Sequence, residues 1–126
     1  MSKIILDTNF LLTMVRYKIH AVQEIKERVN GEIFVLSGTI GELDGLSKGS
    51  KKIKNEVAIV REIIKKNNIR VIESKVENVD NELVEKSNEF VIATNDKKLR
   101  EKIRQTGGKS VYIKKLAMVD MSEITD

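Results

Sequence analysis

Runs of consecutive aliphatic residues alternate along the chain with stretches in which apolar residues recur every three or four positions. The runs at residues 4–6 and 33–36 contain no polar residue, which indicates strands buried on both faces of a sheet. Five such strands are expected, at residues 4–6, 33–36, 69–72, 90–93 and 110–113. The first of them, Ile4-Ile5-Leu6, ends directly at Asp7.

Helical spacing marks the segments between these strands. The strongest segment is residues 51–67, where Ile53, Val57, Val60 and Ile64 form one apolar stripe. Further helices are expected at residues 9–18, 20–29, 80–88 and 97–105, and from residue 40 onward. Alternating strands and helices predict right-handed crossovers, and therefore an α/β fold with a parallel five-stranded sheet covered on both faces. We expect residues 1–126 to form one domain, in which the last dozen residues show no clear element.

The composition of the chain limits the partners and the metal sites that it can have. The 23 basic and 19 acidic residues give a net charge of +4, which suits a polyanionic partner without demanding one. The chain has no cysteine, which excludes disulfides and thiolate metal sites, and its single histidine, His20, excludes His-rich zinc sites. We expect His20 to be a solvated helix start. No apolar run approaches the ~20 residues of a membrane span, so the sequence predicts a cytoplasmic protein.

Four acidic residues share a position near predicted helix starts: Asp7, Glu42, Asp80 and Asp96. The carboxyl ends of parallel strands lie at one edge of a sheet, where ligands of such folds bind, so these acids can converge there. Clustered carboxylates repel one another unless a cation neutralises them. Oxygen ligands without His or Cys select Mg²⁺ or Mn²⁺, and such a site suits phosphodiester hydrolysis.

A purely structural interpretation exists for each of these acids. Aspartate is a preferred helix N-cap, so Asp7, Asp80 and Asp96 could simply cap helices. Thr39-Ile40-Gly41-Glu42 fits a capping box, in which a threonine and a glutamate three residues later bond the helix start reciprocally. Spacing alone leaves the cap and the metal site as equal alternatives.

The motifs themselves carry more information. They are Asp7-Thr8-Asn9-Phe10, Ile40-Gly41-Glu42-Leu43, Val79-Asp80-Asn81-Glu82-Leu83, and Val91-Ile92-Ala93-Thr94-Asn95-Asp96 followed by Lys98-Leu99-Arg100. In this order, over residues 3 to 114, the sequence closely resembles PIN-domain ribonucleases. The first and last motifs are specific, and the middle two are weak alone. Within the family, the sequence looks most like the branch of ribosomal RNA-processing nucleases and their archaeal relatives, with VapC-type toxins as the close competitor.

The resemblance implies a three-layer α/β/α sandwich and a Mg²⁺- or Mn²⁺-dependent endoribonuclease. It implies that Asp7, Glu42, Asp80 and Asp96 form the acidic cluster, and that Thr8, Asn9 and Thr94 orient carboxylates through hydrogen bonds. It also implies RNA as partner and leaves open a homodimer and a protein partner, either an antitoxin or a ribosome-assembly factor.

The third motif departs from the family at Asp80-Asn81, where many relatives carry two adjacent aspartates. Counting back from Leu83 and Val84 places position 80 on the inward helix face and position 81 at its edge. We therefore expect Asp80 to face the metal and Asn81 to form neutral hydrogen bonds. The asparagine also keeps open a domain that binds RNA without cutting it.

Basic residues form two groups. Lys48, Lys51, Lys52 and Lys54 follow the Glu42 helix and are expected to reach a phosphate backbone near the acidic edge. For the second group, on the predicted 97–105 helix, a solvated helix face is an equal alternative; it comprises Lys97, Lys98, Arg100 and Arg104. Base stacking has no evident platform beyond Tyr17 or Tyr112. A phosphatase of the haloacid dehalogenase type is a weak rival, because Asp7-Thr8-Asn9 lacks the second aspartate of its D-x-D motif.

Overall fold

A computed structural model describes residues 2–29, 31–75, 77–114 and 118–124. Six strands form one sheet in the order β3-β2-β1-β4-β5-β6. The strands are β1 (Ser2–Leu6), β2 (Gly31–Leu36), β3 (Arg70–Ile72), β4 (Val91–Ala93), β5 (Ser110–Lys114) and β6 (Met118–Asp120). The first five are mutually parallel, and β6 runs antiparallel to β5.

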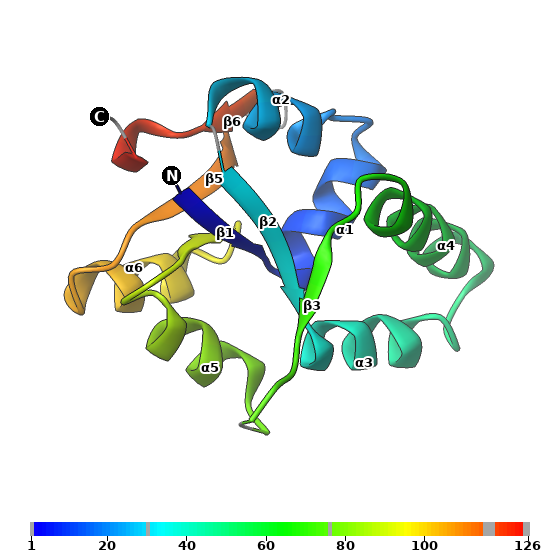
Figure 1. The fold of residues 1–126 in the computed structure, drawn as a ribbon. Coiled ribbons are helices and arrows are strands. Elements are labelled where there is room, and N and C mark those ends of the chain that lie inside the picture. Colours follow the sequence, from blue (N-terminus) through cyan, green and yellow to red (C-terminus); the bar gives the residue numbers. More distant parts are fainter. Residues whose placement is uncertain (1, 30, 76, 115–117, 125–126) are drawn as a thin grey trace.

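Six helices cover the sheet, and a short 3₁₀ turn, η1 (Ser122–Ile124), follows β6. Figure 1 shows α5 and α6 on one face and α1, α3 and α4 on the other, so the predicted three-layer α/β/α sandwich is confirmed. The helices are α1 (Thr8–Arg16), α2 (Ala21–Arg28), α3 (Ser37–Leu46), α4 (Lys51–Lys66), α5 (Val79–Lys86) and α6 (Lys97–Gln105). His20 is exposed at the N-cap of α2, as predicted.

Two hydrophobic cores explain the uninterrupted strands. Successive residues point to opposite faces, so a central strand can serve both cores. In β1, Ile4 and Leu6 pack with α1 and α4, whereas Ile5 packs with α5 and α6. The close pairing of β1 with β2 requires Gly31, because a Cβ at that position would lie 1.8 Å from the carbonyl oxygen of Ser2.

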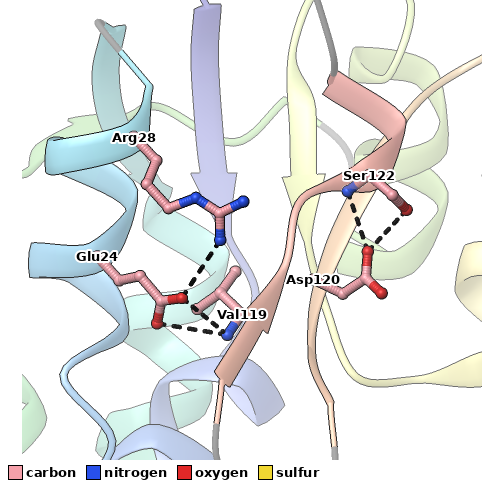
Figure 2. Close-up of polar contacts among 5 residues, drawn as sticks. All are labelled: Glu24, Arg28, Val119, Asp120 and Ser122. Carbon is pink, nitrogen blue, oxygen red and sulfur yellow. Dashed lines mark hydrogen bonds and ion pairs between the residues drawn. The ribbon is translucent and has the colours of Figure 1, made fainter.

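The sixth strand corrects the prediction of five strands. β6 has only three residues, of which Val119 alone is buried, so it is too short to show a periodic pattern. It is held from two sides: β5 pairs with one edge, and on the other the Val119 N–H points at the Glu24 carboxylate of α2, 3.4 Å away (Figure 2). Glu24 in turn pairs with Arg28 at 3.5 Å. This carboxylate occupies an N–H group that an open edge strand would offer to another chain.

The fold brings three strand-to-helix junctions to one edge of the sheet: β1 to α1, β2 to α3, and β4 to α6. The remaining parallel strand followed by a helix, β3, connects through a polar loop to α5. None of the helices in the described part of the chain is long and apolar enough to span a membrane.

Candidate active site

Asp7 is the buried member of the predicted acidic cluster. It follows β1 directly, its side chain is 5% exposed, and its backbone N–H donates to Ala93 of β4 at 2.9 Å. Its carboxylate accepts the Thr8 N–H and the Thr94 hydroxyl, each at 2.8 Å. Burial, together with the smaller effect of the Asp80 and Glu42 charges, nevertheless raises the pKa of Asp7 from 3.8 to about 6. Ionisation of Asp7 therefore destabilises the folded protein.

Glu42 lies on α3, exposed to solvent, and its carboxylate accepts the Thr8 hydroxyl at 2.6 Å. The predicted capping box is wrong, because α3 begins at Ser37 and has Leu36 as its N-cap. Thr39 is consequently inside the helix and buried, and its Oγ1 has no partner within the described residues. The structural interpretation of Glu42 as a capping residue therefore fails.

Asp80 is no cap either. The N-cap of α5 is Asn78, whose side chain accepts the Asn81 N–H at 2.9 Å. The expected inward orientation of Asp80 is also wrong, since both Asp80 and Asn81 are exposed. Leu83 is buried, and Val79 and Val84 are half-buried against the same core, so Leu83 and Val84 face inward as predicted. Asp80 still acts on Asp7 through its charge.

Asp96 does cap a helix. Its Oδ1 accepts the N–H groups of Lys98 and Leu99, at 2.9 and 3.2 Å, which fixes it at the start of α6. Its own N–H donates to the Thr94 hydroxyl at 3.2 Å. Asp96 is thus tied to Asp7 through Thr94, whereas Glu42 and Asp80 are the carboxylates that perturb the pKa of Asp7.

Thr94 is the centre of the hydrogen bonds at this edge and is fully buried. A hydroxyl has one proton, and the 2.8 Å contact to Asp7 Oδ2 is the better donation than the 3.3 Å contact to Asn9 Oδ1. Asn9 Oδ1 accepts the Asn95 N–H instead, at 2.9 Å, and Asn95 Oδ1 accepts the Ile113 N–H at 2.9 Å. Side chains therefore join the ends of β1, β4 and β5.

The residues that were predicted to orient the carboxylates form different hydrogen bonds in the structure. Thr8 and Thr94 bond carboxylates of the cluster, and Asn9 bonds the backbone beside Thr94. The backbone N–H of Asn81 donates to the Asn78 side chain at the start of α5, and the orienting role of the Asn81 side chain stays a prediction. The four predicted RNA-binding lysines are all exposed, and three of them belong to the first turns of α4 rather than to a loop: Lys51, Lys52 and Lys54.

The donor chemistry of the edge fits a hard divalent cation, because it offers carboxylates that repel one another. Across the described residues, however, no group of three Asp, Glu, His or Cys side chains is arranged to hold an ion. Asp7 is fixed by its two hydrogen bonds and Glu42 accepts one from Thr8, whereas the Asp80 side chain is exposed.

Two features were absent from the sequence-based analysis. Glu82 of α5 is 2% exposed, and its Oε1 has no partner among the described residues. Ser37 and Ser74 exchange hydrogen bonds with each other's segments: Ser74 N–H donates to Ser37 Oγ at 2.7 Å, and Gly38 N–H to Ser74 Oγ at 2.8 Å. These bonds span 36 and 37 residues, so no local pattern could indicate them. They fasten the start of α3, which carries Glu42, to the loop after β3.

Comparisons with known proteins agree with this architecture. Ribonuclease VapC4 of Methanocaldococcus jannaschii is 36% identical over 111 residues, which cover 83% of this chain and 85% of that protein. The structure of the PIN domain endonuclease Utp24 superposes with a TM-score of 0.76 at 20% identity, covering 98% of this chain and 93% of that one. A domain of a functionally unknown protein from the same archaeon reaches a TM-score of 0.60 at 16% identity, covering 90% and 92%. A family model described as a PIN-like domain matches residues 4–115, and the chain therefore belongs to the PIN-like domain family.

Proposed function

We propose that the protein is a divalent-metal-dependent endoribonuclease that hydrolyses RNA phosphodiester bonds at the Asp7 edge of the sheet. The observation that carries the proposal is the buried Asp7 carboxylate, whose pKa is raised by burial and by the charges of Asp80 and Glu42. A carboxylate with a strongly perturbed pKa beside other acidic groups is typical of a functional site. The similarity to a protein named Ribonuclease VapC4 supports the reaction class.

In this proposal Asp7, Glu42 and Asp80 hold Mg²⁺ or Mn²⁺, with Asp96 as a fourth acidic residue. A bound divalent cation supplies positive charge that polarises a phosphoryl oxygen of the substrate. Thr94 holds the Asp7 carboxylate in one orientation by its hydrogen bond, and Thr8 does the same for Glu42. Preorganised carboxylates lose little conformational entropy when they bind a cation or orient a nucleophile.

The lysines at the start of α4 support an RNA substrate. Cations in the first turn of a helix oppose the helix dipole, which costs some tenths of a kcal/mol to about 1 kcal/mol each. Lys51 and Lys52 occupy that turn, and Lys54 and Lys48 lie close by in sequence. Helix stability therefore does not account for these residues, whereas contact with a phosphate backbone does.

The biological role is the finer part of the proposal. Maturation of ribosomal RNA and a toxin of a toxin–antitoxin pair both require this reaction. The 36% identity to Ribonuclease VapC4 favours the toxin, because the likeness to Utp24, at 20% identity, carries the fold alone. Growth arrest on expression, relieved by a co-expressed small protein encoded next to the gene, would support the toxin. The proposal includes a cytoplasmic location, which cell fractionation tests.

The activity is tested by incubating the purified protein with structured and unstructured RNA in Mg²⁺, Mn²⁺ or EDTA. Asp7→Asn is the matched control, because asparagine caps a helix about as well as aspartate. We expect internal cleavage with either metal, none in EDTA, and none by the variant. RNA binding without cleavage under every metal condition would replace this proposal with a non-cleaving RNA-binding domain, and cleavage by Asp7→Asn at the wild-type rate would remove Asp7 from the site.

A further inference from the structure

Arg100 of α6 lies flat against the aromatic ring of Tyr112 on β5. Its guanidinium carbon is 3.9 Å from the ring centroid. Its Nε is buried and has no hydrogen-bond partner within the described residues, and Arg100 takes part in none of the ion pairs found there. A buried N–H that lacks an acceptor is unfavourable. The guanidinium is therefore positioned by stacking, while part of its hydrogen-bonding capacity is unused.

The strand register places this guanidinium near the acidic edge. Ala93 pairs with Val111, and the Thr94 N–H donates to the Val111 carbonyl at 3.0 Å, so Thr94 and Tyr112 are neighbours on adjacent strands. Asp7 is the neighbour of Thr94 on the other side, as their 2.8 Å hydrogen bond requires. Asp7 and Tyr112 are thus two strands apart, about 10 Å.

Asp7, Tyr112 and Arg100 lie on the same face of the sheet. Ile5 of β1 packs with α5 and α6, so Asp7, two residues further along, points to that face. Along β5, Val111 and Ile113 belong to the core under α1 and α4, so the intervening Tyr112 points to the face covered by α5 and α6. The guanidinium of Arg100, which reaches Tyr112 from α6, therefore lies on the Asp7 face of the sheet.

The ring of Tyr112 is itself held in place. Its hydroxyl donates to Asp120 Oδ2 at 3.3 Å. Asp120 is fixed by Ser122, whose N–H and hydroxyl donate to Oδ1 at 3.0 and 2.7 Å (Figure 2). These hydrogen bonds occupy the Asp120 carboxylate, which lies beside the ring without forming an ion pair with Arg100. β6 and the residues after it therefore support the stacked guanidinium without neutralising it.

We propose that Arg100 is a phosphate-binding residue for the RNA strand, and that it binds a phosphodiester next to the one at the acidic edge. The proposal rests on the proposed function and adds a substrate contact to it. A planar guanidinium binds a phosphate through two parallel hydrogen bonds, which lysine does not reproduce. The ring of Tyr112 fixes the guanidinium plane, so less conformational entropy is lost when the phosphate binds. Lys97 and Lys98, exposed at the start of the same helix, add positive charge beside it.

Arg104 provides a matched control. It lies one turn further along α6, is exposed, and pairs with Glu101. Arg100→Gln and Arg104→Gln remove the same charge from the same helix. Binding of a labelled single-stranded RNA to the full chain is measured in EDTA over a series of salt concentrations, by fluorescence anisotropy. We expect Arg100→Gln to raise Kd about tenfold and to lower the salt slope of log K by ~0.7, and Arg104→Gln to change Kd less than about twofold.

Equal binding by Arg100→Gln and Arg104→Gln would overturn the proposal, and so would a wild-type protein that binds no RNA. If Arg100→Gln does not fold, Arg100→Lys takes its place. Arg100→Lys keeps the positive charge but loses the planar guanidinium and its paired N–H donors, so it should weaken RNA binding severalfold. Wild-type RNA affinity in Arg100→Lys would refute the role of the stacked guanidinium.

Binding and cleavage are separable in this design. Where the wild-type protein cleaves RNA, Arg100→Gln should raise KM with kcat nearly unchanged, because Arg100 binds the neighbouring phosphate in this proposal and forms no ion pair with an acidic residue in the described part of the chain. A fall in kcat at constant KM would refute a binding role while leaving the nuclease intact. Loss of RNA affinity in Arg100→Gln by a protein that cleaves nothing would support the phosphate contact and reject the proposed reaction.

Discussion

Replacing Asp7 by asparagine should separate the stability of the site from its activity. The difference between a pKa of about 6 in the folded protein and the ordinary 3.8 corresponds to about 3 kcal/mol of destabilisation when the carboxylate is ionised. The folded state binds the Asp7 proton more tightly than the unfolded state does. The destabilisation by Asp7 is therefore small below pH 4, grows as the pH rises to 6, and stays constant above pH 6. An asparagine carries no charge at any pH, so the variant avoids this penalty.

The gain is smaller than the full penalty. The asparagine side chain has one oxygen, whereas the carboxylate accepts from both Thr8 and Thr94. One of these hydrogen bonds is lost, at about 1 kcal/mol. We expect Asp7→Asn to match the wild-type free energy of unfolding near pH 4 and to exceed it by about 2 kcal/mol at pH 7 and above.

Urea unfolding in EDTA, followed by circular dichroism because the chain has no tryptophan, measures this difference between pH 4 and 8. Asp44→Asn is the control, since Asp44 is exposed on α3 and pairs with Arg61 at the surface. It should show no rising gain with pH. An Asp7→Asn protein that is less stable than wild type at pH 7 would refute the burial argument. A divalent cation at a hundredfold its Kd should then stabilise the wild type by about 2.7 kcal/mol and the variant much less.

Three further predictions concern residues around this carboxylate. Thr94→Val removes the hydroxyl that lowers the pKa of the buried aspartate, so the acid limb of the pH–rate profile should move to higher pH, and Thr94→Ser should restore it. Asp80→Asn should abolish cleavage, whereas Asn81→Asp should lower the metal concentration for half-maximal activity; cleavage assays during metal titration measure both, and thermal shift follows metal binding. Alanine at Lys51 and Lys52 should reduce the salt slope of log K for single-stranded RNA by ~0.7 per lost contact, and an unchanged slope would restrict these lysines to solvation.

Strong periodic signals predicted most of the fold. Uninterrupted aliphatic runs located five strands, and the stripe of α4 was correct because Val57 and Val60 are fully buried. β6 was missed, because it depends on pairing with β5 and on Glu24, contacts that are distant in sequence. In α5, Leu83 and Val84 were correctly placed on the inward face, but the burial of Glu82 and Ser87 was missed, because polar residues do not contribute to an apolar pattern.

Residue types at the edge could be predicted, but their partners could not. Thr8 and Glu42 are 34 residues apart in sequence, and Thr94 and Asp7 are 87 apart. Only the sheet order brings them together. The T-x-x-E spacing at Thr39 predicted a capping box because it ignores where α3 begins, and β2 delivers the chain into the helix at Ser37, two residues earlier. A solvated helix face was an equal alternative for Arg100, because its contact with Tyr112 joins α6 to β5 and no local pattern indicates it.

Capping and metal binding, which were equal alternatives for Asp96 in the sequence, are compatible in the structure. Both N–H groups at the start of α6 donate to Oδ1, so those bonds leave Oδ2 unoccupied. The cap fixes the direction of the carboxylate, and the positive end of the helix dipole stabilises its charge. Thr94, which accepts the Asp96 N–H and donates to Asp7, sets the distance between the two acids. A cap of this kind holds one oxygen rigid so that the other can serve a cation, and Asp96 therefore needs no separate structural support at this edge.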